Sequence, residues 1–269
     1  MSFFSHISDP ASLSAIALTL KLAVITSAIL LVITLPLAWA LANWEGRAKP
    51  FVMSVFALPI VLPPTVLGFY LLIAFSPQGW LGQTWQAVTG STLAFSFEGL
   101  VIGSVIYSFP FALQPLYSGF SQFERGYLDA AYSLGFSKVE AFWRIVVPMC
   151  KASIMVALGL SFAHTIGEFG VVLMIGGNIP SETQVLSIAL YENVEALDYE
   201  KAHALSLTLL AFCFLLLSVL YKFNGIPLSR IPAPSSNAGK LSKTEILRKT
   251  GKLSTTEARS DTAQKGNGL

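Results

Sequence analysis

Five long apolar stretches constrain the fold of this chain more than any other feature of its sequence. They run approximately over 13–41, 51–75, 99–120, 154–175 and 204–223. The hydrocarbon core of a bilayer is about 30 Å thick, and about 20 apolar residues in helical form are needed to cross it. Of the 269 residues, 54% are hydrophobic and 12% are charged, too few charges to cover a soluble globule of this size. The sequence therefore predicts an all-α integral membrane protein with about five membrane-spanning helices.

Basic residues distinguish the two sides of these stretches. Lys and Arg occur between the first and second stretches, between the third and fourth, and after the fifth, whereas 76–97 and 176–199 contain neither. Because cytoplasmic loops carry the excess of Lys and Arg in membrane proteins, we expect the N-terminus outside and the C-terminus in the cytoplasm. The moderately apolar stretch 183–196 is too short and too acidic at its end to span. We expect it to form a sixth, short element on the outer side, interfacial or re-entrant.

The chain divides into a transmembrane domain over 1–223 and a basic tail over 224–269. Nine of the 17 Lys and Arg residues lie from Lys222 onward, in a segment rich in Pro, Ser, Thr and Gly and poor in aromatic residues. Such a segment cannot bury enough apolar surface to order itself. We expect a disordered cytoplasmic tail, either merely solvated or attracted to anionic lipid of the inner leaflet.

A charged segment, 123–148, lies between the third and fourth apolar stretches. Residues 123–134 have helical composition, Gly135 should end that helix, and an amphipathic spacing of i, i+3, i+4, i+7 follows. The apolar positions of that spacing are Val139, Phe142, Trp143 and Val146. We therefore expect two short helices that meet near Gly135 on the cytoplasmic side. The pattern alone is equally typical of an interfacial hairpin that only reconnects two spans.

In this segment the chain resembles ABC importer permeases. Their pattern is Glu-Ala-Ala, three residues, Gly, nine residues, Ile, one residue and Leu-Pro. The matching residues here are Asp129, Ala130, Ala131, Gly135, Ile145, Val147 and Pro148. Asp129 replaces Glu and is one methylene shorter, and Val147 replaces Leu. The resemblance implies that the loop around 129–135 docks into a groove of an ATPase and transmits its closure to the spans. The coupling residues it implies are Asp129, Ala130, Ala131, Gly135, Ile145 and Pro148.

The resemblance covers roughly 13–223 and is closest to the molybdate permeases of the oxyanion importers. The stretches that carry it are "LPIVLPPTVLGFYLL" at 58–72 and "AHTIGEFGVVLMIGGNIPSETQVLSIALYENVEAL" at 163–197. It implies the ABC type I importer permease fold, a place in the bacterial inner membrane, and a path for molybdate. Sulfate or thiosulfate permeases share the loop and the Gly-Glu-Phe-Gly stretch, and tungstate has nearly the size and charge of molybdate. These substrates remain alternatives.

The same resemblance implies a set of partners. They are a second copy of this chain, two cytoplasmic ATP-binding subunits, an extracytoplasmic molybdate-binding protein and membrane lipid, without nucleic acid. The sequence has no Gly-rich phosphate-binding loop with Lys and Ser or Thr, so we expect no ATP site in this chain. ATP and Mg²⁺ are expected on the partner ATPase. We therefore expect a transport subunit that is not itself an enzyme and holds neither a cofactor nor a metal.

A molybdate path must be polar or water-filled, because a dianion is very costly to bury in lipid. Glu168, within Gly167-Glu168-Phe169-Gly170, is the one acidic residue expected at membrane depth, where an ionisable group is a functional candidate by default. Its carboxylate would repel the anion, so we expect a structural or gating role at a helix break between Gly167 and Gly170. A position near the outer interface is the alternative. His164, four residues earlier, would share a helix face with Glu168.

The second apolar stretch should also be broken. It contains Pro59, Pro63, Pro64 and Gly68 within ten residues, which should kink or break a helix. Broken backbone at membrane depth is tolerated only where it is buried in protein or lines a cavity. Thr65 is therefore a candidate for the path, together with Gly167, Glu168 and Gly170.

Two other classes of membrane protein fit less well. A secondary transporter usually has ionisable residues at the midplane and a repeat between its halves, and neither is clear here. It would also leave the charged segment 123–148 unexplained. A membrane enzyme would need clustered acidic, His or Cys residues, whereas the three histidines are scattered along the chain.

Overall fold

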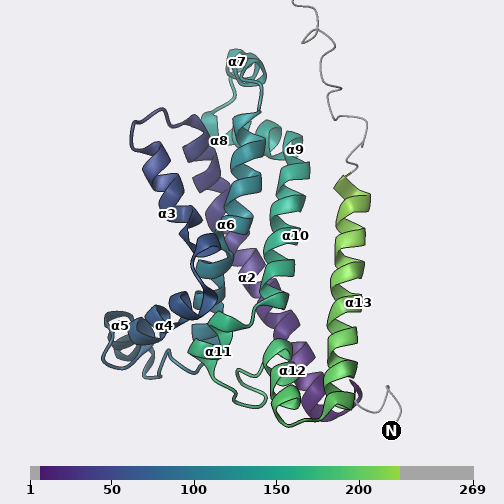
Figure 1. Cartoon of the computed structure of the whole chain (residues 1–269). Helices are drawn as coiled ribbons and strands as arrows, with labels where there is room; N and C mark the ends of the chain where they lie inside the picture. Colours follow the sequence, from purple (N-terminus) through teal and green to yellow (C-terminus); the bar gives the residue numbers. More distant parts are fainter. Residues whose placement is uncertain (1–6, 225–269) are drawn as a thin grey trace, which may run out of the picture. The chain divides into compact units, whose positions relative to one another are not determined.

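The structure is a computed structural model that describes residues 7–224, and every regular element in this part is a helix (Figure 1). The basic tail expected over 224–269 lies outside the described residues, apart from Asn224. The elements are α2 (Pro10–Asn43), α3 (Lys49–Val61), α4 (Pro64–Phe75), α5 (Trp80–Thr89), α6 (Phe97–Ser121), α7 (Gly126–Ser133), α8 (Lys138–Ala141), the π-helical turn η1 (Phe142–Val146), α9 (Val147–Met149), α10 (Lys151–Gly167), α11 (Gly170–Gly176), α12 (Leu186–Glu195) and α13 (Tyr199–Asn224).

Three helices are long and apolar enough to cross a membrane alone, namely α2, α6 and α13. Two bent pairs complete the set. The helices α3 and α4 meet at 105°, and the helical run Lys138–Met149 meets α10 at 75°. By length and composition the described residues thus contain three membrane spans, or up to five if each bent pair is one span. The orientation with the N-terminus outside stays a prediction.

The expected break in the second stretch is present. Helix α3 ends at Val61 and α4 begins at Pro64. Pro63 and Pro64 lack the N–H groups that would continue α3, and proline disfavours helical backbone in the residue before it. Gly68 does not take part in the break. It is buried within α4, and a Cβ there would lie 2.8 Å from the Cβ of Met174, so this glycine allows α4 and α11 to pack closely.

The fourth stretch, expected as one span over 154–175, is divided. Helix α10 ends at Gly167, Glu168 has an extended backbone with φ −67° and ψ 130°, and α11 begins at Gly170. The helix break thus lies between the two glycines, as the sequence predicts. The seven residues of α11 cover only about 10 Å, so α11 cannot itself complete a crossing.

The stretch 183–196 forms the expected short element. Helix α12 has ten residues, about 15 Å, half of what a bilayer core requires. The backbone N–H of Leu186, its first residue, donates to Thr19 Oγ1 of α2 at 2.7 Å. The first turn of α12 is therefore fixed to a long span.

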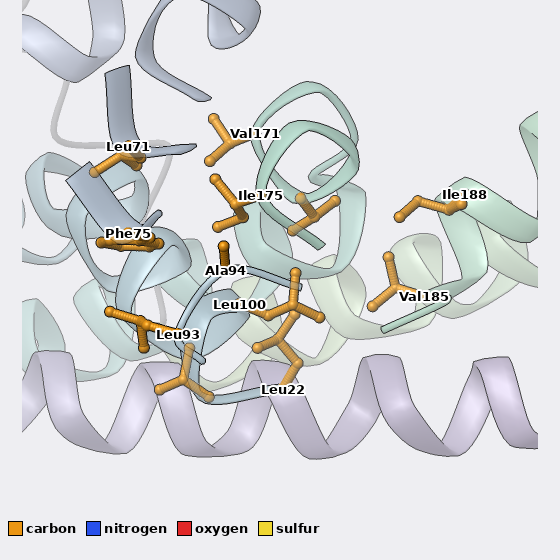
Figure 2. Close-up of a cluster of buried hydrophobic side chains, with 12 residues drawn as sticks. Leu22, Leu71, Phe75, Leu93, Ala94, Leu100, Val171, Ile175, Val185 and Ile188 are labelled. Carbon is orange, nitrogen blue, oxygen red and sulfur yellow. The ribbon is translucent and has the colours of Figure 1, made fainter. Parts of the chain in front are cut away.

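Three clusters of buried apolar side chains hold the described helices together; the two larger ones lie at opposite ends of the bundle, and a small one joins α2, α12 and α13. Figure 1 shows α7, α8 and α9 at one end and α5, α11 and α12 at the other. At the α12 end, side chains from α2, α4, α6, α11 and α12 converge, as Figure 2 shows for Leu22, Phe75, Leu100, Ile175 and Ile188. At the α7 end, buried residues of α7, α8 and η1 pack on α2 and α6. Both ends of α2 and of α6 are thus attached to short helices.

Candidate functional site

All four residues expected along the path line one cavity of about 520 Å³. Thr65 comes from the start of α4, and Gly167, Glu168 and Gly170 come from the break between α10 and α11. The sequence separates Thr65 from this break by about a hundred positions. The two broken spans are therefore brought together at their breaks.

The two glycines of the break differ in their surroundings. A Cβ on Gly170 would lie 2.7 Å from the Cβ of Pro64, closer than real Cβ contacts, so the start of α11 rests directly on the start of α4. A Cβ on Gly167 would meet nothing within 4 Å. Close packing therefore explains Gly170 but does not explain Gly167.

Glu168 is buried, with 3% of its surface exposed. Neither oxygen of its carboxyl group has a hydrogen-bond partner among the described residues, and the same holds for the buried hydroxyl of Ser104 on α6. This hydroxyl lies near the carboxyl group without reaching hydrogen-bond geometry. Burial of an unpaired carboxyl group is costly, and its site lies in the protein interior rather than at the outer surface of the chain. The arrangement marks Glu168 as a functional candidate.

The backbone at the break is tied to α12. The hydroxyl of Ser187 donates to the carbonyl oxygen of Glu168 at 2.6 Å, and both residues are buried. The ring of Phe169 also lies 5.0 Å from that of Tyr191 on α12. Any movement of the break relative to α12 must therefore disrupt these contacts.

A polar seam joins α6 to α10 beside the cavity. Thr165 donates its hydroxyl hydrogen to the carbonyl of Ser161 at 2.9 Å. The contact of 3.1 Å between the hydroxyls of Ser108 and Thr165 must then use the hydrogen of Ser108. The contact of 2.9 Å between Ser108 Oγ and His164 Nδ1 requires a hydrogen on Nδ1 by the same reasoning. The seam thus fixes the tautomer of His164.

His164 lines the cavity but is not hydrogen-bonded to Glu168. Its ring stacks on Phe111 with centroids 3.9 Å apart and lies 4.7 Å from Tyr107. The shared face expected from their four-residue spacing is lost because α10 ends at Gly167. Among residues 7–224, no group of three or more His, Cys, Asp or Glu side chains is placed to hold a metal.

The first half of the charged segment has the two faces that a docking helix needs. Helix α7 buries Leu128 and Ala131 against the protein and exposes Asp129 and Ala130. The helix ends as the sequence predicts, because Gly135 has φ +88°. This left-handed conformation favours glycine and satisfies the last helical carbonyls. The backbone N–H of Phe136 donates to the carbonyl of Ala131 at 3.1 Å.

The second half of the segment departs from the expected amphipathic face. Val146 is buried and Phe142 is half-buried, but Val139 and Trp143 are 69% and 57% exposed. The face expected from an α-helical spacing is therefore partly wrong. The reason is the π-helical turn η1, which inserts an extra residue per turn and changes the face that each side chain occupies. Ile145 packs on the buried cluster, and Pro148 is exposed.

Several residues around these sites were not anticipated from the sequence. Tyr107 lines the cavity, Ser104 lies beside Glu168, and Ser187 binds the backbone of the break. Tyr107 and Ser104 lie in an apolar stretch whose spacing gives no sign of which face meets the break. Ser187 lies in the short element whose contacts depend on tertiary packing. No local pattern in the sequence identifies them.

Comparison with known proteins identifies the family of this chain. Residues 33–224 match the family described as "Binding-protein-dependent transport system inner membrane component". The chain is 47% identical over 209 residues to the molybdenum transport system permease protein ModB of Azotobacter vinelandii, covering 78% of this chain and 92% of that protein. It is 32% identical to ModB of Haemophilus influenzae over 77% of this chain and 90% of that one. A probable sulfate transport system permease protein, cysT of Nephroselmis olivacea, is 31% identical over 80% and 75%.

Solved structures share the fold. A bacterial ABC transporter involved in the import of the acidic polysaccharide alginate superposes with a TM-score of 0.66 at 15% identity, covering 86% of this chain and 84% of that one. The MetNI methionine ABC transporter superposes with a TM-score of 0.59 at 12% identity, covering 78% and 93%. These comparisons confirm the helical permease fold. The chain therefore belongs to the family of binding-protein-dependent transport system inner membrane components and is a multi-pass permease subunit of an ABC transporter in the inner membrane.

Proposed function

We propose that this chain forms the transmembrane path for molybdate in an ATP-driven importer. The observation that carries this proposal is its 47% identity to a molybdenum permease over 92% of that protein's length. Identity to the sulfate permeases is 28–31% over 75–82% of theirs. The higher identity to the molybdenum permease, over a larger share of its length, favours molybdate over sulfate as the substrate.

The proposed complex contains two copies of this chain, two cytoplasmic ATP-binding subunits and an extracytoplasmic molybdate-binding protein. ATP and Mg²⁺ would be held by the ATP-binding subunits, and this chain would not hydrolyse ATP. The exposed Asp129 and Ala130 on α7 supply a charged, small-residue surface that a cytoplasmic partner can approach closely. Leu128 and Ala131 anchor the same helix in the core, so a force on its exposed face would reach the spans.

The proposed path passes the cavity at the two helix breaks. Thr65, Tyr107 and His164 line this cavity and carry groups that can hydrogen-bond to a hydrated oxyanion. Glu168 is assigned a gating role rather than direct contact, because a carboxylate beside the anion would repel it. The burial of its side chain supports this role, and the hydrogen bond from Ser187 to its backbone carbonyl holds the break against α12.

The test is ATP hydrolysis by this chain reconstituted with its cognate ATP-binding subunit and binding protein, titrated with molybdate, tungstate and sulfate. We expect the binding protein loaded with molybdate to stimulate hydrolysis, and sulfate to have no effect. Stimulation by sulfate alone would overturn the substrate and leave the importer in place. Failure of any ATP-binding subunit to associate would overturn the assignment of 123–148 as the coupling segment.

A further inference from the structure

A connected set of aromatic rings links the α7 end of the molecule to two spans. Trp39, near the end of α2, lies with its ring centroid 5.6 Å from Phe120 of α6, 6.1 Å from Phe123 and 5.6 Å from Phe142 of η1. The first two contacts are edge-to-face, at 86° and 84°, a favourable geometry for aromatic pairs. Trp39 is thus the common neighbour of rings from α6, from the linker before α7 and from η1.

The set continues outward to the exposed face of the charged segment. Phe123 lies 6.1 Å from Tyr127 of α7, and Phe142 lies 5.3 Å from Trp143. Tyr127 and Trp143 are 48% and 57% exposed. These rings form what we call the aromatic network. It runs from the exposed Tyr127 and Trp143, through half-buried Phe123 and Phe142, to Trp39 at its centre, and it includes Phe120 of α6.

The ion pair between this segment and the turn that follows α2 is weak. Arg125 forms an ion pair with Glu45 at 3.8 Å, but both side chains are largely exposed, at 68% and 86%. Ion pairs of this kind contribute little and are screened by salt. Packed rings cannot compress, because protein interiors are already close-packed. A displacement of α7 and η1 is therefore transmitted to α2 and α6 through these rings and through the buried residues packed around them.

Helix α2, which carries Trp39, and helix α6, which contacts it through Phe120, both extend to the cavity end of the molecule. Helix α6 carries Tyr107 in the cavity wall and Ser108 in the polar seam. Helix α2 receives the hydrogen bond from the first turn of α12 through Thr19. The two spans joined at Trp39 thus reach the break at Glu168 from two sides. Helix α6 contacts α10 just before the break, and α2 holds α12, which binds the backbone of the break.

We infer that Trp39 is a positioning residue that transmits movement of the 123–148 segment to α2 and α6 during transport. The inference rests on the proposed function, since it assumes that an ATP-binding subunit moves this segment. Trp39 itself touches neither nucleotide nor substrate in this assignment. Its loss should therefore separate ATP hydrolysis from transport rather than abolish either by unfolding the protein.

The test measures molybdate taken up per ATP hydrolysed in proteoliposomes that contain the full chain, its ATP-binding subunit and its binding protein. Trp39→Leu should lower this ratio at least about fivefold while hydrolysis stays within about twofold of wild type. Trp39→Phe retains an aromatic ring and should keep the ratio within about twofold. An unchanged ratio in Trp39→Leu, or an equal loss in Trp39→Phe, would overturn the inference.

A matched control comes from a ring pair outside the network. Phe56 of α3 and Phe109 of α6 lie 5.1 Å apart, and Phe56→Leu should leave the ratio unchanged; an equal fall there would show that any lost ring packing has this effect and would overturn the inference. If Trp39→Leu does not assemble, Phe142→Leu carries the same prediction from the other side of the contact. If the wild type takes up another anion instead of molybdate, the substrate proposal fails, and the ratio is measured with that anion.

Discussion

The hydroxyl of Ser187 on α12 donates a 2.6 Å hydrogen bond to the backbone carbonyl of Glu168, at the point where the fourth span is interrupted. The next residue toward the N-terminus, Leu186, donates its backbone N–H to Thr19 of α2. Helix α12 therefore bridges the break and a long span through adjacent residues. A short helix that cannot cross the membrane thereby fixes the geometry of the candidate path.

Removing the Ser187 hydroxyl should weaken this bridge. Ser187→Ala leaves the Glu168 carbonyl buried without that donor, which costs about 1–3 kcal/mol of stability. We expect a lower melting temperature of the purified permease in detergent and slower molybdate uptake. Ser54→Ala is the control, because that hydroxyl is exposed and bonds only within its own helix; a similar loss there would contradict the role of Ser187.

Replacing the carboxyl group of Glu168 should affect transport more than folding. Glu168→Gln keeps the size of the side chain and removes an unpaired buried carboxyl group, so stability should not fall. If Glu168 holds the gate, uptake in proteoliposomes should fall by about tenfold or more. Normal uptake by Glu168→Gln would exclude this role, and Glu182→Gln, in the exposed loop before α12, provides the control.

The two glycines of the break should respond differently to alanine. Gly170→Ala places a methyl group 2.7 Å from Pro64 Cβ, and such overpacking costs about 1–3 kcal/mol. Gly167→Ala meets nothing within 4 Å and should leave stability unchanged or slightly raised. Thermal unfolding of both variants in the same detergent measures the difference, and equal melting temperatures would contradict the packing described for Gly170.

The charge on α7 should be required for coupling. Asp129 is exposed, so Asp129→Arg should leave the permease folded and in the membrane while uptake is abolished, because the reversed charge would oppose docking of the ATP-binding subunit. Asp129→Glu should retain uptake, since it restores the residue typical of the family. Glu182→Arg, an exposed charge reversal outside the 123–148 segment, is the control and should retain uptake. Normal uptake by Asp129→Arg would remove Asp129 from the coupling surface.

The helical membrane fold could be predicted because its signals are local. Apolar length identifies the spans, the prolines at 63 and 64 separate α3 from α4, and Gly135 ends α7 through its positive φ. The break at Glu168 could also be anticipated, since two glycines flank an acidic residue in an otherwise apolar stretch.

The remaining features depend on contacts between distant parts of the chain. Gly68 resembles a helix breaker in the sequence, but it is a close-packing position against Met174. The exposed faces of Val139 and Trp143 follow from the π-helical turn, which an α-helical spacing cannot reveal. The ring contacts of Trp39 join residues about a hundred positions apart, and no periodicity in the sequence identifies such a pair.

The most direct measurement of the proposed function is uptake of labelled molybdate by proteoliposomes that contain the complete complex. We predict uptake that requires ATP and the binding protein and that persists in a large excess of sulfate. ATP-driven uptake of sulfate without uptake of molybdate would contradict the proposed substrate. Molybdate uptake that continues without ATP or an ATP-binding subunit would contradict the importer itself.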